Sequence, residues 1–142
     1  MESKLFCMVY TSSASELFDD EALQSLLNVA RKNNKQQDVT GMLLYSEGVF
    51  MQALEGEKQS VEQLYNMIAK DPRHYGVIIL NQSFIESRQF SQWQMGFKVA
   101  SRQELVESSS FTDFLNPDFD IRQLQKQPSI AMKLLLSFRK NM

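Results

Sequence analysis

Residues 39–56, VTGMLLYSEGVFMQALEG, carry the pattern that decides the fold. Two apolar runs, Val39–Ser46 and Val49–Leu54, flank the dipeptide Glu47-Gly48. Runs of this length around a glycine-containing pair predict two antiparallel strands joined by a tight hairpin. A polar residue, Gln52, lies inside the second run, where alternation along a strand places its side chain on the same face as Phe50.

The sequence on either side of this hairpin predicts two helices and three more strands. The predicted elements are a strand at Leu5–Tyr10, a helix at Asp20–Lys32 that Asn33 and Asn34 end, a helix at about Ser60–Lys70, a strand that begins at Val77–Leu80 and a strand within Gln92–Val99. Asp19 is a suitable N-cap for the first helix, and Asp71-Pro72 breaks the second.

The order βαββαββ contains two crossovers and therefore predicts an α+β, ferredoxin-like sheet. In that topology the first and third strands are neighbours in the centre, and both helices cover one face. Cys7 and Val9 make the other face of the first strand apolar as well. We expect residues 1–99 to form the domain and residues 100–142 to form a helical extension packed on this second face.

Composition excludes several classes of function. The chain has 142 residues, which suits one domain, and 15 basic against 17 acidic residues give a net charge of −2. This balance predicts no nucleic-acid partner, and no apolar run reaches membrane-spanning length. Cys7 and His74, the single cysteine and histidine, do not make a metal site, and a cytoplasmic location is the default.

Tyr10 and Gln52 are the first candidate site residues. If the first and third strands are neighbours, the two side chains meet on the sheet face beneath the helices. Burying a carboxamide without partners costs about 1–3 kcal/mol, so Gln52 requires a polar neighbour. A structural bond between the two strands satisfies this need, and so does a ligand edge shared with Tyr10.

Other polar and aromatic residues also have a structural and a functional interpretation. Asn33 and Asn34 cap a helix, or they pair with an uncharged ring edge, because a carboxamide carries both a donor and an acceptor. Trp93 and Met95 share a strand face and are core residues or neighbours of Gln52. Arg73 and His74 are solvated or hold a phosphate.

Together these segments resemble one family. Tyr10, RKNN (31–34), residues 39–56, KDPRHYG (70–76) and WQM (93–95) occur in the order and spacing of BLUF domains, and the resemblance spans about residues 4–98. It implies a blue-light photoreceptor that binds FAD non-covalently between the two helices, with FMN or riboflavin as possible alternatives. No enzymatic activity is implied.

The resemblance also implies a role for each candidate. Tyr10 matches the electron-donating tyrosine and Gln52 the glutamine that changes its hydrogen bonds. Trp93 and Met95 match the pair whose inward or outward placement varies. The implied flavin-binding residues are Asn33, Asn34 and Gln52 at the ring edge, Leu26, Leu27, Phe50 and Ile68 on the ring, and Asp71, Arg73 and His74 near the ribityl and phosphate tail. Met67 departs from relatives that carry an arginine at that position.

The expected output is a signal to another protein of unknown identity, together with self-association into a homo-oligomer, because the sequence contains no recognisable output enzyme. Two other functions are considered. A flavin-free ferredoxin-like interaction module would keep the fold without the cofactor. A small ferredoxin-like hydrolase or isomerase would need a positioned base or nucleophile, and the sequence offers no acidic pair or phosphate loop for it.

Overall fold

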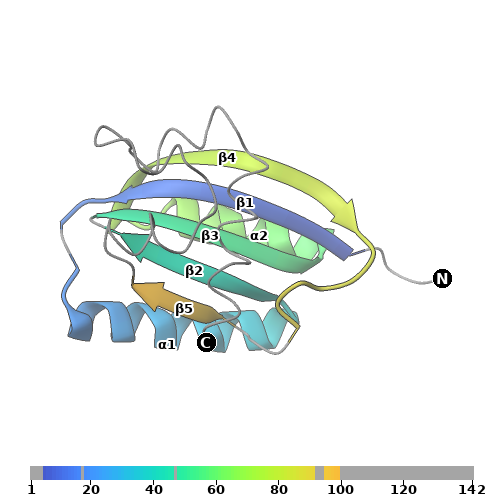
Figure 1. Cartoon of the computed structure of the whole chain (residues 1–142), viewed down its shortest axis with the longest axis horizontal. Helices are drawn as coiled ribbons and strands as arrows, with labels where there is room; N and C mark the ends of the chain where they lie inside the picture. The colour runs from blue at the N-terminus through green and yellow to red at the C-terminus, as the bar shows by residue number, and fades with distance from the viewer. Residues whose placement is uncertain (1–4, 17, 47, 92–94, 100–142) are drawn as a thin grey trace, which may run out of the picture.

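The computed structural model describes residues 5–16, 18–46, 48–91 and 95–99, and the described elements follow the order βαββαββ (Figure 1). They are β1 (Leu5–Ala14), α1 (Asp20–Gln37), β2 (Thr40–Ser46), β3 (Val49–Glu57), α2 (Lys58–Ala69), β4 (His74–Ile85) and β5 (Gly96–Val99). The helical extension predicted for residues 100–142 and the side chain of Trp93 lie outside the described residues.

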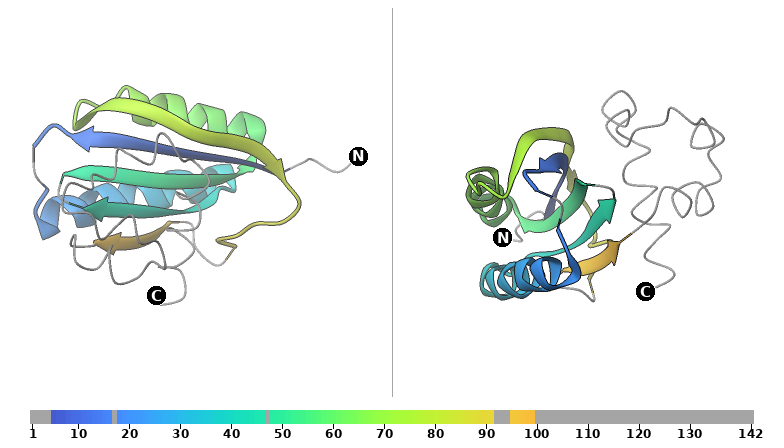
Figure 2. Two further views of the ribbon diagram at one scale, coloured as in Figure 1. Left: turned by 45° about the horizontal axis from the view of Figure 1, so that its top comes forward. Right: turned by 90° about the vertical axis from the view of Figure 1, so that its left-hand side faces the viewer.

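The strands form one five-stranded sheet in the order β4-β1-β3-β2-β5. β1 pairs antiparallel with both β3 and β4, β3 pairs antiparallel with β2, and β5 pairs parallel with β2. Both helices lie on the same face of the sheet (Figure 2). The α+β ferredoxin-like architecture and the adjacency of the first and third strands are therefore confirmed.

Helix α1 is longer than the sequence pattern predicts. Its start is as expected, because the Asp19 carboxylate accepts a 2.8 Å hydrogen bond from the backbone N–H of Ala22. Its end is not, since the helix continues through Asn33 and Asn34 to Gln37. The prediction that the two asparagines end the helix is wrong. Asp38 ends it instead, in a left-handed conformation (φ 55°) that lets its N–H bond back to the carbonyl of Asn34.

Two strands also extend further than predicted. β1 continues to Ala14 through two serines that are buried despite their polarity, and β3 continues through Gly56 to Glu57. Within the sheet, Gly41 of β2 lies so close to β3 that an added Cβ would sit 2.0 Å from the carbonyl oxygen of Ala53. A side chain at position 41 would therefore force the two strands apart.

Strands β1, β2 and β3 are buried on both faces of the sheet, whereas the edge strand β4 is largely exposed. The face toward the helices contributes to a cluster that includes Phe6, Met8, Leu54 and Leu64. Residues of the opposite parity are equally inaccessible, and they are Cys7, Val9, Met42, Leu44, Met51 and Ala53, each at most 3% exposed. β3 thus presents a buried surface on each side.

Glu55 is a buried carboxylate on the face opposite the helices, where it pairs across the strands with Cys7. Its Oε2 accepts a 2.8 Å hydrogen bond from the N–H of Gln89, and its Oε1 accepts bonds from the N–H of Phe90 (2.6 Å) and the Thr40 hydroxyl (3.1 Å). The chain between β4 and β5 must cross from one edge of the sheet to the other. Glu55 fixes that crossing segment at its middle.

We predict that replacing Glu55 lowers stability sharply. Glu55→Gln keeps the shape but puts an NH₂ group against a backbone N–H that needs an acceptor, so the free energy of unfolding should fall by about 2–4 kcal/mol. Urea unfolding measures this loss. Glu57→Gln on the same strand removes an exposed carboxylate and is the matched control, which should change little. Equal stability of the two variants would contradict the anchoring role.

The second prediction concerns Cys7. Burial, with a smaller contribution from the charge of Glu55, raises the pKa of this thiol to about 12. The reactive thiolate is therefore scarce at mildly alkaline pH. A disulfide reagent should leave the folded protein unlabelled and should label one thiol per chain after denaturation, since Cys7 is the single cysteine. Fast labelling of the folded protein would show that the site opens.

Candidate functional site

A cavity of about 180 Å³ lies between the two helices and the sheet. Tyr10, Ser12, Leu43, Phe50 and Gln52 line it from the sheet. Leu26, Val29, Ala30, Asn33 and Asn34 line it from α1, and Leu64, Met67 and Ile68 line it from α2. Phe18, Asp71, Arg73 and His74 complete the wall. The space therefore opens where the predicted site residues converge.

Tyr10, Gln52 and Met95 form a buried chain of polar contacts on the cavity side of the sheet. Tyr10 and Gln52 are directly opposed in the pairing of β1 with β3, and the Tyr10 hydroxyl donates a hydrogen bond to Gln52 Oε1. The other end of the carboxamide, Nε2, donates to the sulfur of Met95 at 3.3 Å. The predicted meeting of Tyr10 with Gln52 is present, and Met95 lies inward.

Tyr10 holds its proton firmly in this setting. The ring is 2% exposed and packs edge-on against Tyr65 with centroids 5.6 Å apart. Burial raises the pKa of the Tyr10 phenol, and the neighbouring Tyr65 raises it further. A phenol that stays protonated remains a hydrogen-bond donor to Gln52. It can also lose an electron and a proton together.

The two asparagines lie on the cavity side of α1. Asn34 is 2% exposed and Asn33 is half-buried. Both residues lie inside the helix, so their side chains do not cap it. Helix capping therefore does not explain why they line the cavity. With Gln52 they give the lining three carboxamides. Such groups pair with an uncharged ring edge of carbonyl and N–H groups without adding charge.

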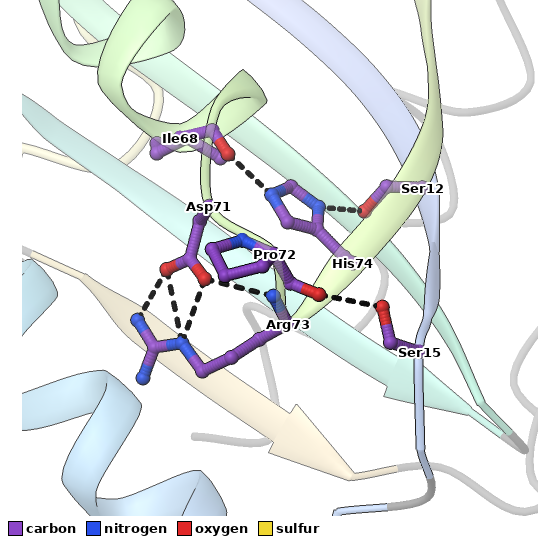
Figure 3. A network of polar contacts seen from close by, with 7 residues as sticks. All are labelled: Ser12, Ser15, Ile68, Asp71, Pro72, Arg73 and His74. Atoms are coloured by element: carbon purple, nitrogen blue, oxygen red, sulfur yellow. Dashed lines mark hydrogen bonds and ion pairs between the residues drawn. The ribbon is translucent and has the colours of Figure 1, made fainter.

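One end of the cavity carries charge (Figure 3). The guanidinium of Arg73 donates to both carboxylate oxygens of Asp71, and this bond holds the pKa of Asp71 below its usual range. His74 Nε2 donates to the carbonyl of Ile68 at the end of α2, and its Nδ1 lies 2.7 Å from the Ser12 hydroxyl. His74 therefore ties α2 to β1 at this end.

Of the apolar residues predicted to pack on the flavin ring, some line the cavity and one lies in the core. Leu26, Phe50 and Ile68 line the cavity. Leu27 does not, because it is 2% exposed and packs in the core cluster. Met67 lines the cavity as an exposed side chain, where some relatives were expected to carry arginine.

Several lining residues were missed by sequence reasoning, and two of them have a periodic signal. Ser12 lies two residues beyond Tyr10, so it shares the same strand face. Ala30 lies four residues beyond Leu26 and three before Asn33, so the three residues share a helix face.

The donor set fits a flavin. Carboxamides suit the carbonyl and N–H edge of its ring, leucine, isoleucine and phenylalanine side chains suit the faces of the ring, and Arg73 at the charged end suits a phosphorylated tail. Among the described residues no group of three His, Cys, Asp or Glu side chains could hold a metal ion, and no helix there is long and apolar enough to cross a membrane.

Solved structures share this architecture. The dark-state structure of BlrB, a BLUF protein, is 28% identical, with a TM-score of 0.68 over 92% of this chain and 98% of that one. The structure of Klebsiella pneumoniae BlrP1 with FMN and cyclic diGMP is 25% identical, with a TM-score of 0.65 over 88% of this chain and 34% of that one.

Two curated relatives are longer proteins. The blue light- and temperature-regulated antirepressor BluF of Escherichia coli is 36% identical over 81 residues, which are 55% of this chain and 20% of the antirepressor. The photoactivated adenylate cyclase subunit beta of Euglena longa is 34% identical over 95 residues, which are 66% of this chain and 11% of the subunit. This chain thus spans a fifth or less of each.

The family model for sensors of blue light using FAD matches residues 5–96. That range contains the described elements from β1 to the start of β5, and it includes the whole Tyr10–Gln52–Met95 chain. The protein therefore belongs to the BLUF family of blue-light flavin sensors.

Proposed function

We propose that this chain senses blue light through FAD bound non-covalently in the cavity between α1 and α2. The observation that carries the proposal is the Tyr10–Gln52 hydrogen bond, which lies on the cavity wall and continues to Met95. We expect FMN and riboflavin to bind as well. Arg73 is the one cation on the described lining, and it is already paired with Asp71, so its contact with a phosphate would not by itself select one of the three flavins.

Different residues of the cavity wall would contact different parts of the flavin. Asn33, Asn34 and Gln52 would hold the polar ring edge, with Leu26, Phe50 and Ile68 packed on the ring and Leu27 supporting Leu26 from the core. Asp71, Arg73 and His74 would lie beside the tail. Hydrogen bonds hold these side chains in place. Arg73 donates to the carboxylate of Asp71, and His74 donates to the carbonyl of Ile68.

The mechanism uses Tyr10 and Gln52 in sequence. A bound flavin supplies a strong one-electron oxidant when it absorbs blue light. Tyr10 would give an electron and its phenolic proton to that oxidant, and the hydrogen bond to Gln52 Oε1 would be lost with the proton. The carboxamide then turns or tautomerises. The electron and proton would return from the oxidant to Tyr10, so no reactant would be consumed and a changed hydrogen-bond pattern would remain.

The new pattern acts on Met95. In the structure Gln52 presents Nε2 to the sulfur, which is a weak acceptor. A turned carboxamide presents Oε1 there, and two acceptors do not attract one another. Met95 loses its hold on Gln52, and β5 follows. Trp93 near the start of β5 is proposed to take part in this movement.

The output is proposed to be a contact with another protein. The chain is proposed to catalyse no reaction itself, to associate with further copies of itself and to act in the cytoplasm, where the thiol of Cys7 stays reduced. Residues 100–142 are proposed to form the helical extension that relays the movement of β5. No nucleic acid or membrane partner is proposed, in keeping with the net charge of −2.

A flavin-free interaction module is the second candidate. One observation favours it, because every buried side-chain nitrogen and oxygen of the described residues has a partner without a ligand. The cavity is the counter-argument. A module without a ligand would have no reason to surround an open space with three carboxamides, so we prefer the sensor.

Tyr10→Phe tests the proposed mechanism. Phenylalanine keeps the packing and removes the hydroxyl, so flavin should still co-purify. The light-induced red shift of the flavin absorption should vanish, and the fluorescence lifetime of the flavin should increase. Light-minus-dark absorption spectra measure this result, with Tyr65→Phe as the matched control that keeps the Tyr10–Gln52 bond. A full reversible red shift in Tyr10→Phe would show that the assigned role is wrong. A colourless wild-type protein from flavin-replete cells would refute the sensor itself.

Asn34→Ala tests the binding edge separately. Loss of one hydrogen bond to a buried ring carbonyl should weaken flavin binding by about 1–2 kcal/mol, or roughly tenfold in Kd, while the red shift of the bound fraction persists. Titration of apoprotein with flavin measures the affinity. Asn28→Ala on the same helix is the control, because Asn28 is exposed and does not line the cavity. Equal affinities would remove Asn34 from the site.

A further inference from the structure

Met95 is held by a second residue that the proposed mechanism does not use. Arg31 of α1 donates a hydrogen bond from its Nε to the backbone carbonyl of Met95 at 3.1 Å. Figures 1 and 2 show α1 running beside β5, which begins at the next residue, Gly96. The side chain of Met95 therefore contacts Gln52 while its backbone contacts a helix.

The side chain of Met95 packs in the core cluster, but among the described residues its backbone is not held by strand pairing. β5 has four residues, lies at an edge of the sheet and pairs with β2 from Gly96 onward, so Met95 lies just outside the ladder. The next described anchor on the N-terminal side is Phe90, whose N–H is bound by Glu55. Arg31 thus holds the residue whose placement the ladder does not fix.

Arg31 is also placed on the helix that forms the cavity wall. Its neighbour Ala30 and Asn34, three residues further on, both line the cavity. A charged N–H donor makes a stronger bond to a carbonyl than a neutral donor does, and the flat guanidinium loses little freedom in making it. The α1 wall and β3 therefore meet at one residue, Met95, through its carbonyl and its sulfur.

We propose that Arg31 is a positioning residue that holds the carbonyl of Met95, and thereby keeps the sulfur of Met95 within reach of Gln52. Its role in signalling rests on the proposed photoreceptor function. Its role in placing Met95 does not, because the bond joins two parts of the chain without a cofactor. The two roles therefore have separate tests.

The placement of Met95 is tested by NMR of protein with ¹³C-labelled methionine methyl groups, kept in the dark. Met95→Leu identifies the Met95 signal by its disappearance. Arg31→Gln should shift or broaden that signal more than those of the other methionines, and Arg31→Lys, which keeps a charged donor, should restore most of its position. Lys32→Gln is the matched control, since it removes the same charge from the next exposed position. An unmoved Met95 signal in Arg31→Gln would overturn the proposal.

The signalling role is tested by the return of the illuminated protein to the dark state. Arg31→Gln should slow this return by about threefold or more, as expected when a hydrogen bond is lost from the arrangement being re-formed. Lys32→Gln should leave the rate unchanged. In a Met95→Leu background, Arg31→Gln should have no further effect, because residues that act through one another are not additive.

If the effect of Arg31→Gln persists in full in the Met95→Leu background, Arg31 acts elsewhere. If Arg31→Gln leaves the return rate of the otherwise wild-type protein unchanged, Arg31 does not act in signalling. Either result overturns the signalling role. If the wild-type protein binds no flavin and shows no light response, the photoreceptor function fails, while the methyl signal of Met95 still decides whether Arg31 places that residue.

Discussion

The antiparallel register of β1 with β3 is the constraint on which the rest of the structure depends. It sets Tyr10 directly opposite Gln52 on one face of the sheet and Cys7 opposite Glu55 on the other. A shift of one residue would exchange the faces of every side chain on β3. The cavity would then lose the carboxamide of Gln52, and the carboxylate of Glu55 would point toward the helices.

Side chains on both faces of β3 bond to the connection between β4 and β5. β4 and β5 lie at opposite edges, so the connection between them crosses the end of the sheet. Glu55 binds the backbone of Gln89 and Phe90 from the face away from the helices. Gln52 binds Met95 from the cavity face. The strand that carries Gln52 therefore also fixes the segment that leads to Met95, the residue that Gln52 contacts.

Sequence patterns predicted what depends on local periodicity. The period-two alternation in residues 49–54 placed Gln52 on the face of Tyr10, and the two crossovers placed β1 beside β3. The end of α1 could not be predicted this way, because asparagine is typical of helix ends and the actual stop depends on the left-handed backbone of Asp38. No local pattern predicted the role of Glu55, since two of its three partners are backbone N–H groups 34 and 35 positions away and the third is the Thr40 hydroxyl on the neighbouring strand.

The contact between Gln52 and Met95 explains how a small event could be both reversible and transmissible. A thioether is a weak acceptor, so breaking its bond to a carboxamide costs far less than breaking a bond between strongly polar groups. In the proposed mechanism a turn of one amide would therefore be enough to release Met95. Arg31 adds a charged hydrogen bond on the other side of the same residue. A weak contact at the sulfur would let the side chain of Met95 respond to Gln52, and the stronger bond at the carbonyl would favour the return of the start of β5 to its original position.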